Sequence, residues 1–255
     1  MNAILDLDAP VTAKGVTQRH LWISGHNERP VPGLVLTPDG TSGPRPVILL
    51  GHGASGSKDE PQMLSIARWF VRREGWAVAI IDGPVHGERR TSANGNVGLE
   101  ARASLINRET YEAMAADWQR TLDACGELPN VGLDHAAYMG FSMGCVLGIL
   151  SVAKEPRLRC AVFAIGGILQ EEHSFLNEAA ETIDRPVLMI NQSEDEIFSR
   201  ASSFRLYDAL SGSKRITFHP GRHTDVPREA MEQTRAFLRA ELTEAVETDA
   251  PRGAH

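Results

Sequence analysis

A series of short apolar segments runs along this chain, and longer segments with a helical period separate them. Each apolar segment is unbroken rather than alternating, which is typical of a strand whose sheet is covered by helices on both faces. Because helices separate these strands, right-handed crossovers and a parallel sheet are expected. The predicted parallel strands are residues 46–50, 76–81, 135–139, 159–164, 186–190 and 215–218.

The two ends of the chain depart from this pattern. Residues 16–24 and 31–36 read as strands joined by a turn at residues 25–27, so an antiparallel hairpin is expected. The first 14 or so residues and the tail from about 244 to 255 are polar and lack a sustained period, and we expect both to be frayed. The helices predicted between strands are residues 61–74, about 99–125, 143–153, 199–210 and 226–242.

No repeat, low-complexity block or linker divides the 255 residues, so we predict a single domain with a core of about 16–242. The expected fold class is α/β, with three layers and helices on both faces of a doubly wound sheet. This sheet would hold about eight strands, mostly parallel, with antiparallel strands at the N-terminal side. Ligands of such sheets bind beyond the carboxyl ends of the strands, so chemistry is expected there.

Composition excludes several classes of protein. The net charge of −7, with both signs interspersed, argues against binding to nucleic acid. Three cysteines without a CxxC pair argue against a disulfide framework and a structural zinc site. The N-terminus lacks the basic start of a signal peptide, and no apolar run approaches the ~18–20 residues of a membrane span. We therefore expect a cytoplasmic protein without membrane contacts.

The strongest chemical signal is Gly140-Phe-Ser142-Met-Gly144, which lies between a predicted strand and a predicted helix. A nucleophilic serine on such a tight turn needs small neighbours, because side chains there would crowd the strained backbone. The alternative is an ordinary strand-to-helix turn in which the serine caps the helix. The position at the end of a strand favours the nucleophile elbow.

With this motif, residues 16–242 resemble the α/β-hydrolase family. A second segment that matches is Leu50-Gly51-His52-Gly53-Ala54-Ser55-Gly56, at the place of the family's oxyanion-hole loop. Glycines there let a backbone amide approach a developing oxyanion. The resemblance implies that the amides of Ala54 and Met143 are the donors and that His52 orders the loop. The alternative for this segment is a glycine-rich turn without a chemical role.

The resemblance also implies an acid and then a histidine, each after a later strand. Asp195 occupies the place of the acid, in a turn that precedes a short apolar segment, with Glu194 and Glu196 as competing carboxylates. His223 follows a glycine in the loop before the last helix and matches the catalytic histidine better than His219, which abuts the strand. Together with the elbow serine, Asp195 and His223 form the predicted triad.

The segment 82–90 resembles the family's Gly-His-Gly-type turn, which is usually structural. His86, Glu88 and Arg89 would nevertheless lie near the cleft mouth, and His86 is the candidate substrate-binding residue. The polar stretch 83–107 forms either a small lid or a disordered surface loop.

The connection between the strands 159–164 and 186–190 is about twenty residues long, too short for the large helical cap of many relatives. A small or absent cap indicates an open cleft for short or medium acyl groups.

The activity implied by the resemblance is that of a serine esterase, which cleaves a small ester or acyl substrate through an acyl-enzyme without a metal or cofactor. The dienelactone-hydrolase-like branch is similar in loop and cap but typically carries a cysteine nucleophile. Alternatives on the same triad are a thioesterase, peptidase, carbon–carbon hydrolase, lactone hydrolase or cofactor-free haloperoxidase. A different class is a ligand-binding protein without catalysis. The natural substrate and the oligomeric state stay open.

Overall fold

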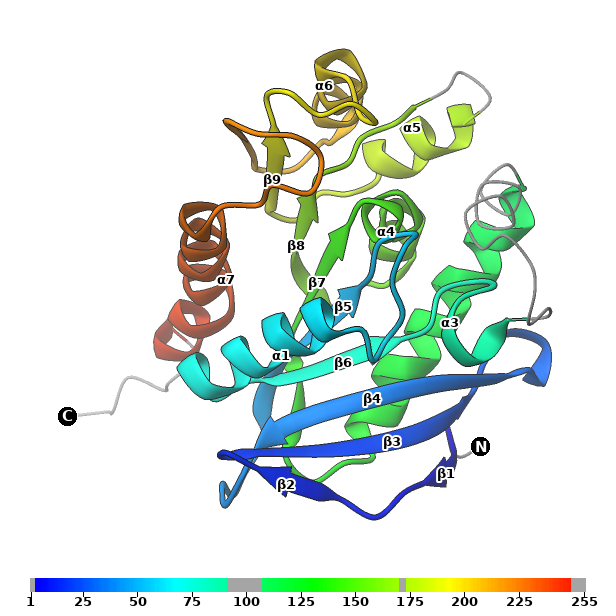
Figure 1. Ribbon diagram of the computed structural model, residues 1–255, viewed down its shortest axis with the longest axis vertical. Helices are drawn as coiled ribbons and strands as arrows, with labels where there is room; N and C mark the ends of the chain where they lie inside the picture. Colours follow the sequence, from blue (N-terminus) through cyan, green and yellow to red (C-terminus); the bar gives the residue numbers. More distant parts are fainter. Residues whose placement is uncertain (1–2, 91–106, 170–172, 249–255) are drawn as a thin grey trace.

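The computed structural model describes residues 3–90, 107–169 and 173–248, and its described strands join in one mixed sheet (Figure 1). The strand order is β1-β3-β4-β6-β5-β7-β8-β9-β10, and β2 pairs with β3 outside this path. The strands are β1 Ile4–Leu7, β2 Val11–Ala13, β3 Val16–Ser24, β4 Pro30–Pro38, β5 Arg45–Gly51, β6 Ala77–Ile81, β7 Val131–Phe141, β8 Leu158–Ala164, β9 Val187–Gln192 and β10 Lys214–His219.

The direction of the strands divides this sheet into two parts. From β6 through β5, β7, β8 and β9 to β10, all neighbours are parallel. The strands β1, β2, β3 and β4 pair in antiparallel fashion, and β4 joins β6 antiparallel to the rest. The predicted hairpin is therefore confirmed as β3 and β4, joined by the short 3-10 helix η1, His26–Glu28.

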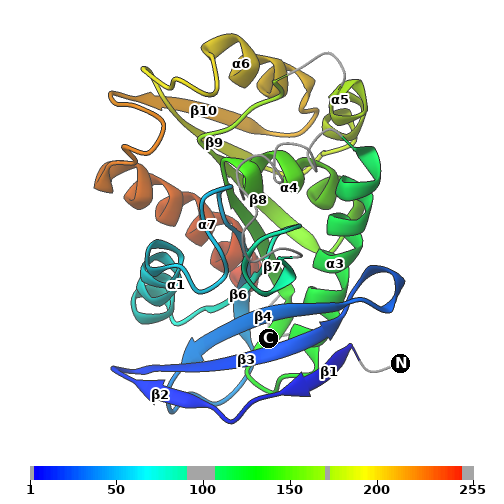
Figure 2. The ribbon, with the colours of Figure 1, turned by 45° about the vertical axis from the view of Figure 1, so that its right-hand side comes forward.

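Helices cover both faces of the sheet, which confirms the predicted α/β class (Figure 2). Alternate side chains of one strand enter different cores: Ile48 packs on the side of α1 and α7, and Val47 on the side of α3 and α4. The helices are α1 Pro61–Glu74, α3 Arg108–Gly126, α4 Met143–Lys154, α5 Ser174–Glu181, α6 Arg200–Ala209 and α7 Arg228–Thr248.

The N-terminal segment corrects an expectation, because it forms β1 and β2 instead of a frayed end. All three residues of β2 are exposed, so the strand is held by backbone pairing with β3. It has no buried apolar face, and the sequence pattern therefore does not indicate a strand. Likewise α7 continues to Thr248, past the predicted start of the tail at 244. Residues 249–255 of that tail lie outside the described residues.

Residues 91–106, most of the predicted lid or surface loop, also lie outside the described part. The described beginning of this stretch contains the 3-10 helix η2, Gly87–Arg89. Among the described helices, none is both long and apolar enough to cross a membrane.

Candidate functional site

Ser142 lies at the tight turn between β7 and α4, with backbone angles φ 52° and ψ −113°. Both flanking glycines are needed for close approach of backbone segments. A Cβ at Gly140 would lie 2.4 Å from the carbonyl oxygen of Gly144, and a Cβ at Gly144 would lie 2.5 Å from the carbonyl oxygen of Gly51. A non-glycine residue at positive φ is strained, and such strain is concentrated at functional sites. The turn therefore has the local geometry expected of a nucleophile elbow.

The three residues of the predicted triad lie in contact. His223 Nε2 is 3.0 Å from Ser142 Oγ, and His223 Nδ1 is 2.8 Å from Asp195 Oδ2. The Asp195 side chain is 1% exposed, and its Oδ1 accepts hydrogen bonds from the amides of Ile197 and Phe198, both at 2.8 Å. The Phe198 ring stacks on the imidazole with centroids 5.7 Å apart. The carboxylate and the imidazole are thus held in one orientation.

The competing residues have other partners. Glu196 Oε2 accepts a hydrogen bond from the His223 amide at 2.9 Å, and that hydrogen bond lowers the pKa of this exposed carboxyl. His219 Nε2 lies 3.3 Å from Gln233 Oε1 on α7. The Glu196 carboxylate thus binds the backbone amide of His223, whereas the Asp195 carboxylate contacts the imidazole ring.

The glycine-rich loop after β5 is fixed by His52. Its Nδ1 donates to the Gly53 carbonyl and its Nε2 accepts from the Gly83 amide, both at 2.8 Å. Burial lowers the pKa of His52 to about 4, so the ring is neutral near pH 7. The amides of Ala54 and Met143 donate to no backbone carbonyl in the described part of the chain. Met143 is the first residue of α4, where helix amides lack partners within the helix.

His86 packs against this loop. Its side chain is buried, with Nε2 at 2.8 Å from the Ala54 carbonyl and Nδ1 at 2.6 Å from the Pro84 carbonyl. The rings of His86 and His52 meet edge to face, with centroids 5.2 Å apart. The contacts of His86 therefore run to the loop that carries the Ala54 amide.

The buried residues Lys58 and Asp82 and the exposed Glu88, together called the buried ion network, join the same loop to the turn after β6. Lys58 is 1% exposed and Asp82 is 0% exposed, and their Nζ and Oδ2 atoms are 3.1 Å apart. Lys58 Nζ also donates to Glu88, which in turn lies 2.9 Å from His20 Nε2. Burial alone lowers the pKa of Lys58, but Glu88 and Asp82 outweigh it and raise that pKa above its usual range. The ammonium of Lys58 is thus held in its charged form.

A pocket of about 270 Å³ opens at Ser142 and His223. Its lining also includes Ile165, whose φ of 46° is unusual for a β-branched residue. The other lining residues are Gly53, Ala54, Ser55, Gly56, Glu60, Gln62, Met63, Phe141, Ile197, Thr224 and Val226. The pocket thus brings the serine, the histidine and the Ala54 loop to one apolar cavity.

Among the described residues there is neither a cluster of metal ligands nor an exposed thiol. Among them, no three His, Cys, Asp or Glu side chains gather as metal ligands. All three cysteines are buried thiols, and burial raises the pKa of Cys125 to about 12 and those of Cys145 and Cys160 further. These thiols therefore stay protonated near neutral pH.

Two features of the site were not predicted from the sequence: the pairing of Lys58 with Asp82, and the contact of Glu196 with the His223 backbone. Lys58 and Asp82 are 24 positions apart and carry no periodic signal. The one available signal was the position of Asp82 directly after a buried strand, where a carboxylate needs a cation or amides as partners.

A known protein family and several solved structures are similar to this chain. The profile of the family described as Serine hydrolase (FSH1) matches residues 44–236, most of the chain. A cold-adapted esterase from an Arctic intertidal metagenomic library is 27% identical, with a TM-score of 0.80 over 92% of this chain and 97% of that one.

More distant structures share the fold. An acetyl xylan esterase from Paenibacillus sp. R4 is 19% identical, with a TM-score of 0.74 over 94% of this chain and 88% of that one. A putative dienelactone hydrolase from Klebsiella pneumoniae is 15% identical, with a TM-score of 0.76 over 91% of this chain and 100% of that one. A search of curated proteins finds no significant match. The profile match and the α/β-hydrolase architecture confirm the predicted family, and the chain belongs to the Serine hydrolase (FSH1) family.

Proposed function

We propose that this serine hydrolase cleaves carboxylic esters of small to medium size through an acyl-enzyme formed on Ser142. The observation that carries the proposal is the chain of contacts from Ser142 through His223 to Asp195, at 3.0 and 2.8 Å. A nucleophile, a base in hydrogen-bond reach and a group that orients the base are the parts that covalent acyl transfer requires.

In this mechanism His223 removes the proton from Ser142 Oγ as the oxygen attacks the substrate carbonyl. Asp195 keeps the proton on Nδ1, so that Nε2 is free to act as the base, and it stabilises the imidazolium that forms. His223 then protonates the leaving alcohol. Water, deprotonated by the same imidazole, hydrolyses the acyl-enzyme and restores the serine.

The oxyanion is held by the amides of Ala54 and Met143. Ala54 lines the pocket, and Met143 follows Ser142 at the elbow. Neither amide has a backbone acceptor among the described residues, which supports this assignment. Fixed amide dipoles stabilise the tetrahedral intermediate because they need no reorganisation as the charge develops. In this proposal His52 and His86 are positioning residues, since their contacts run to the loop through Gly53, Gly83 and the Ala54 carbonyl.

The size of the pocket supports a short or medium acyl group. Its volume of about 270 Å³ is at the lower edge of small-molecule sites, which usually measure about 300–1,000 Å³. Met63, Phe141 and Val226 give its wall an apolar character suited to an alkyl chain.

The test combines covalent labelling with turnover. A fluorophosphonate is expected to add to the peptide that contains Ser142, and Ser142→Ala is expected to lose labelling and at least about 10³-fold in kcat. Ser151→Ala is a matched control, because Ser151 lies on the same helix with its hydroxyl bonded to the Leu147 carbonyl. Label on another residue, or full turnover by Ser142→Ala, would reject the proposal.

A panel of substrates then separates ester hydrolysis from other reactions of the same triad. We expect p-nitrophenyl acetate and butyrate to be turned over faster than the decanoate, and faster than matched thioesters, lactones and peptides. Preferred turnover of a thioester or a peptide would leave the triad in place and overturn the substrate class.

The cytoplasmic location and the lack of nucleic-acid partners stay predictions from the sequence.

A further inference from the structure

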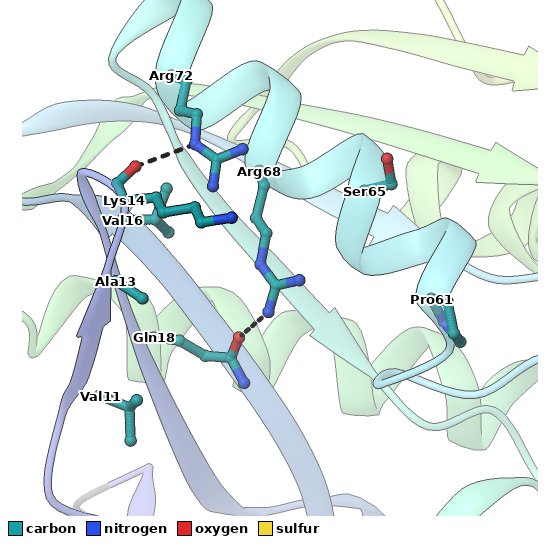
Figure 3. A pocket seen from close by; sticks show the side chains of 9 residues that line it. All are labelled: Val11, Ala13, Lys14, Val16, Gln18, Pro61, Ser65, Arg68 and Arg72. Atoms are coloured by element: carbon teal, nitrogen blue, oxygen red, sulfur yellow. Dashed lines mark hydrogen bonds between the residues drawn. The ribbon is translucent and has the colours of Figure 1, made fainter.

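A second pocket, of about 560 Å³, lies between the β2–β3 hairpin and one side of α1 (Figure 3). Its polar side chains are Lys14 and Gln18 from the hairpin and Ser65, Arg68 and Arg72 from the helix. We call it the α1 pocket. It shares no lining residue with the pocket at Ser142 and is about twice as large.

The charge of the α1 pocket is of one sign. Lys14, Arg68 and Arg72 all line it, and none of its lining residues in the described part is acidic. None of the three forms an ion pair with a residue that the structure describes, although the whole chain carries a net charge of −7. Like charges four positions apart on a helix, as at Arg68 and Arg72, repel each other. An anion in the pocket would relieve this repulsion.

Hydrogen bonds hold the cations around the pocket. Arg68 Nη2 donates to Gln18 Oε1 at 3.2 Å, and Arg72 Nε donates to the Lys14 carbonyl at 3.1 Å (Figure 3). The Arg72 bond uses only Nε, so both terminal nitrogens of that guanidinium are left for a ligand. Lys14 itself stands at φ 50° beside Gly15 at φ 77°, in a tight turn that fixes where its side chain leaves the hairpin.

From this arrangement we propose that the α1 pocket binds a small organic diphosphate, at a site separate from the esterase centre. Guanidinium groups match phosphate oxygens in a two-point geometry, and three cations balance the charge of a diphosphate. The Ser65 hydroxyl adds a neutral donor, and the exposed Val11 and Pro61 offer apolar surface for the organic part.

The test is calorimetric titration of the full protein with inorganic pyrophosphate at low salt, with citrate as a second probe. Saturable pyrophosphate binding is expected, weakened about tenfold or more by Arg68→Gln and by Arg72→Gln. Lys14→Gln is also expected to weaken pyrophosphate binding. Because Lys14 is exposed in a turn, this substitution should not affect folding. Arg73→Gln is the matched control, since Arg73 is an exposed neighbour that does not line the pocket.

The outcomes are decisive either way. Binding lost in the pocket variants and kept in Arg73→Gln supports the site. No saturable binding, or equal binding by wild type and the pocket variants, overturns it. Citrate bound as tightly as pyrophosphate rejects phosphate as the recognised group. None of these readouts uses ester turnover, so they are independent of the proposed function.

Discussion

Two charged clusters lie beside the same strand, and they differ in whether their charges are paired. On β3, His20 reaches the buried ion network through Glu88, while Gln18, two positions earlier, holds Arg68 in the α1 pocket. In the network the ammonium of Lys58 and the carboxylates of Asp82 and Glu88 are paired. In the α1 pocket the cations have no ionic partner among the described residues.

The difference follows from the cost of removing charge from water. A buried ion without a partner is costly, so a fold can keep Lys58 and Asp82 inside only as a pair with further hydrogen bonds. An exposed cation is screened by solvent and salt and can stay unpaired at little cost. Substitutions of the buried charged groups should therefore have large effects that depend little on salt, and those in the α1 pocket should have small, salt-dependent effects.

The largest effect is expected at the carboxylate that contacts His223. Asp195→Asn leaves the imidazole without its anion and favours the wrong tautomer, so kcat should fall by about 10²–10⁴. Glu194→Gln and Glu196→Gln should lose less than about tenfold, because neither carboxylate reaches the ring. All three variants are compared on one ester, with circular dichroism as the check on folding. A large loss at a glutamate with Asp195→Asn near wild type would assign the acid elsewhere.

The next largest effect is expected in the buried ion network. Lys58→Met leaves Asp82 buried without its ammonium, which should cost about 3–5 kcal/mol of the free energy of unfolding. Because the network anchors the loop that carries Ala54, kcat should fall more than KM changes. Urea unfolding and ester kinetics measure the two effects.

The double variant Lys58→Met/Asp82→Asn is the control, because it removes the uncompensated charge and should recover part of the stability. If Lys58→Met unfolded at the same urea concentration as wild type, the network would contribute nothing to the fold.

A smaller effect is expected from His52 as the pH is lowered. The unfolded chain binds a proton at His52 near pH 6.5, whereas the folded protein does so only near pH 4. Between these values the unfolded state holds one more proton, so the free energy of unfolding falls as the pH falls, by up to about 3 kcal/mol. Above pH 6.5 this contribution is fully present. Unfolding in urea between pH 7 and pH 4.5 measures it, and His52→Gln should flatten this part of the slope; an unchanged slope would contradict the assignment.

The sequence predicted the elements that bury apolar side chains on both faces. The strands β5, β6, β8 and β9 were expected within a few residues of their ends because each is an unbroken apolar run between helices. It failed at β2, where Val11, Thr12 and Ala13 are exposed and pairing with β3 alone makes the strand. Backbone pairing does not depend on the type of side chain, so the sequence of such an edge strand cannot be told from that of a frayed end.

In the candidate site too, the residues that depend on local backbone structure could be predicted, and those that depend on distant partners could not. Ser142 could be found because close backbone contacts require glycines two positions before and two positions after it, which gives a short sequence motif. Glu196 and Lys58 could not, because their roles depend on the position of His223 and Asp82 in the folded chain. The substrate-binding role of His86 stays a prediction, and the contact of its buried ring with the Ala54 carbonyl could not be predicted because it depends on the folded position of the loop.

The smallest effect is expected in the α1 pocket, and it tests most directly whether this pocket differs from the buried ion network. Arg72→Gln removes repulsion with Arg68, worth about 0.2–0.5 kcal/mol, and gives up an exposed hydrogen bond to the Lys14 carbonyl of similar worth. The net change in the free energy of unfolding should therefore stay within about 0.5 kcal/mol, and the variant should gain relative to wild type as salt is removed. Urea unfolding at low and at high salt gives this difference, with Arg73→Gln as the control for loss of a cation outside the pocket. A salt-independent loss as large as that of Lys58→Met would show that Arg72 belongs to a paired structural network, and the contrast between the two clusters would not hold.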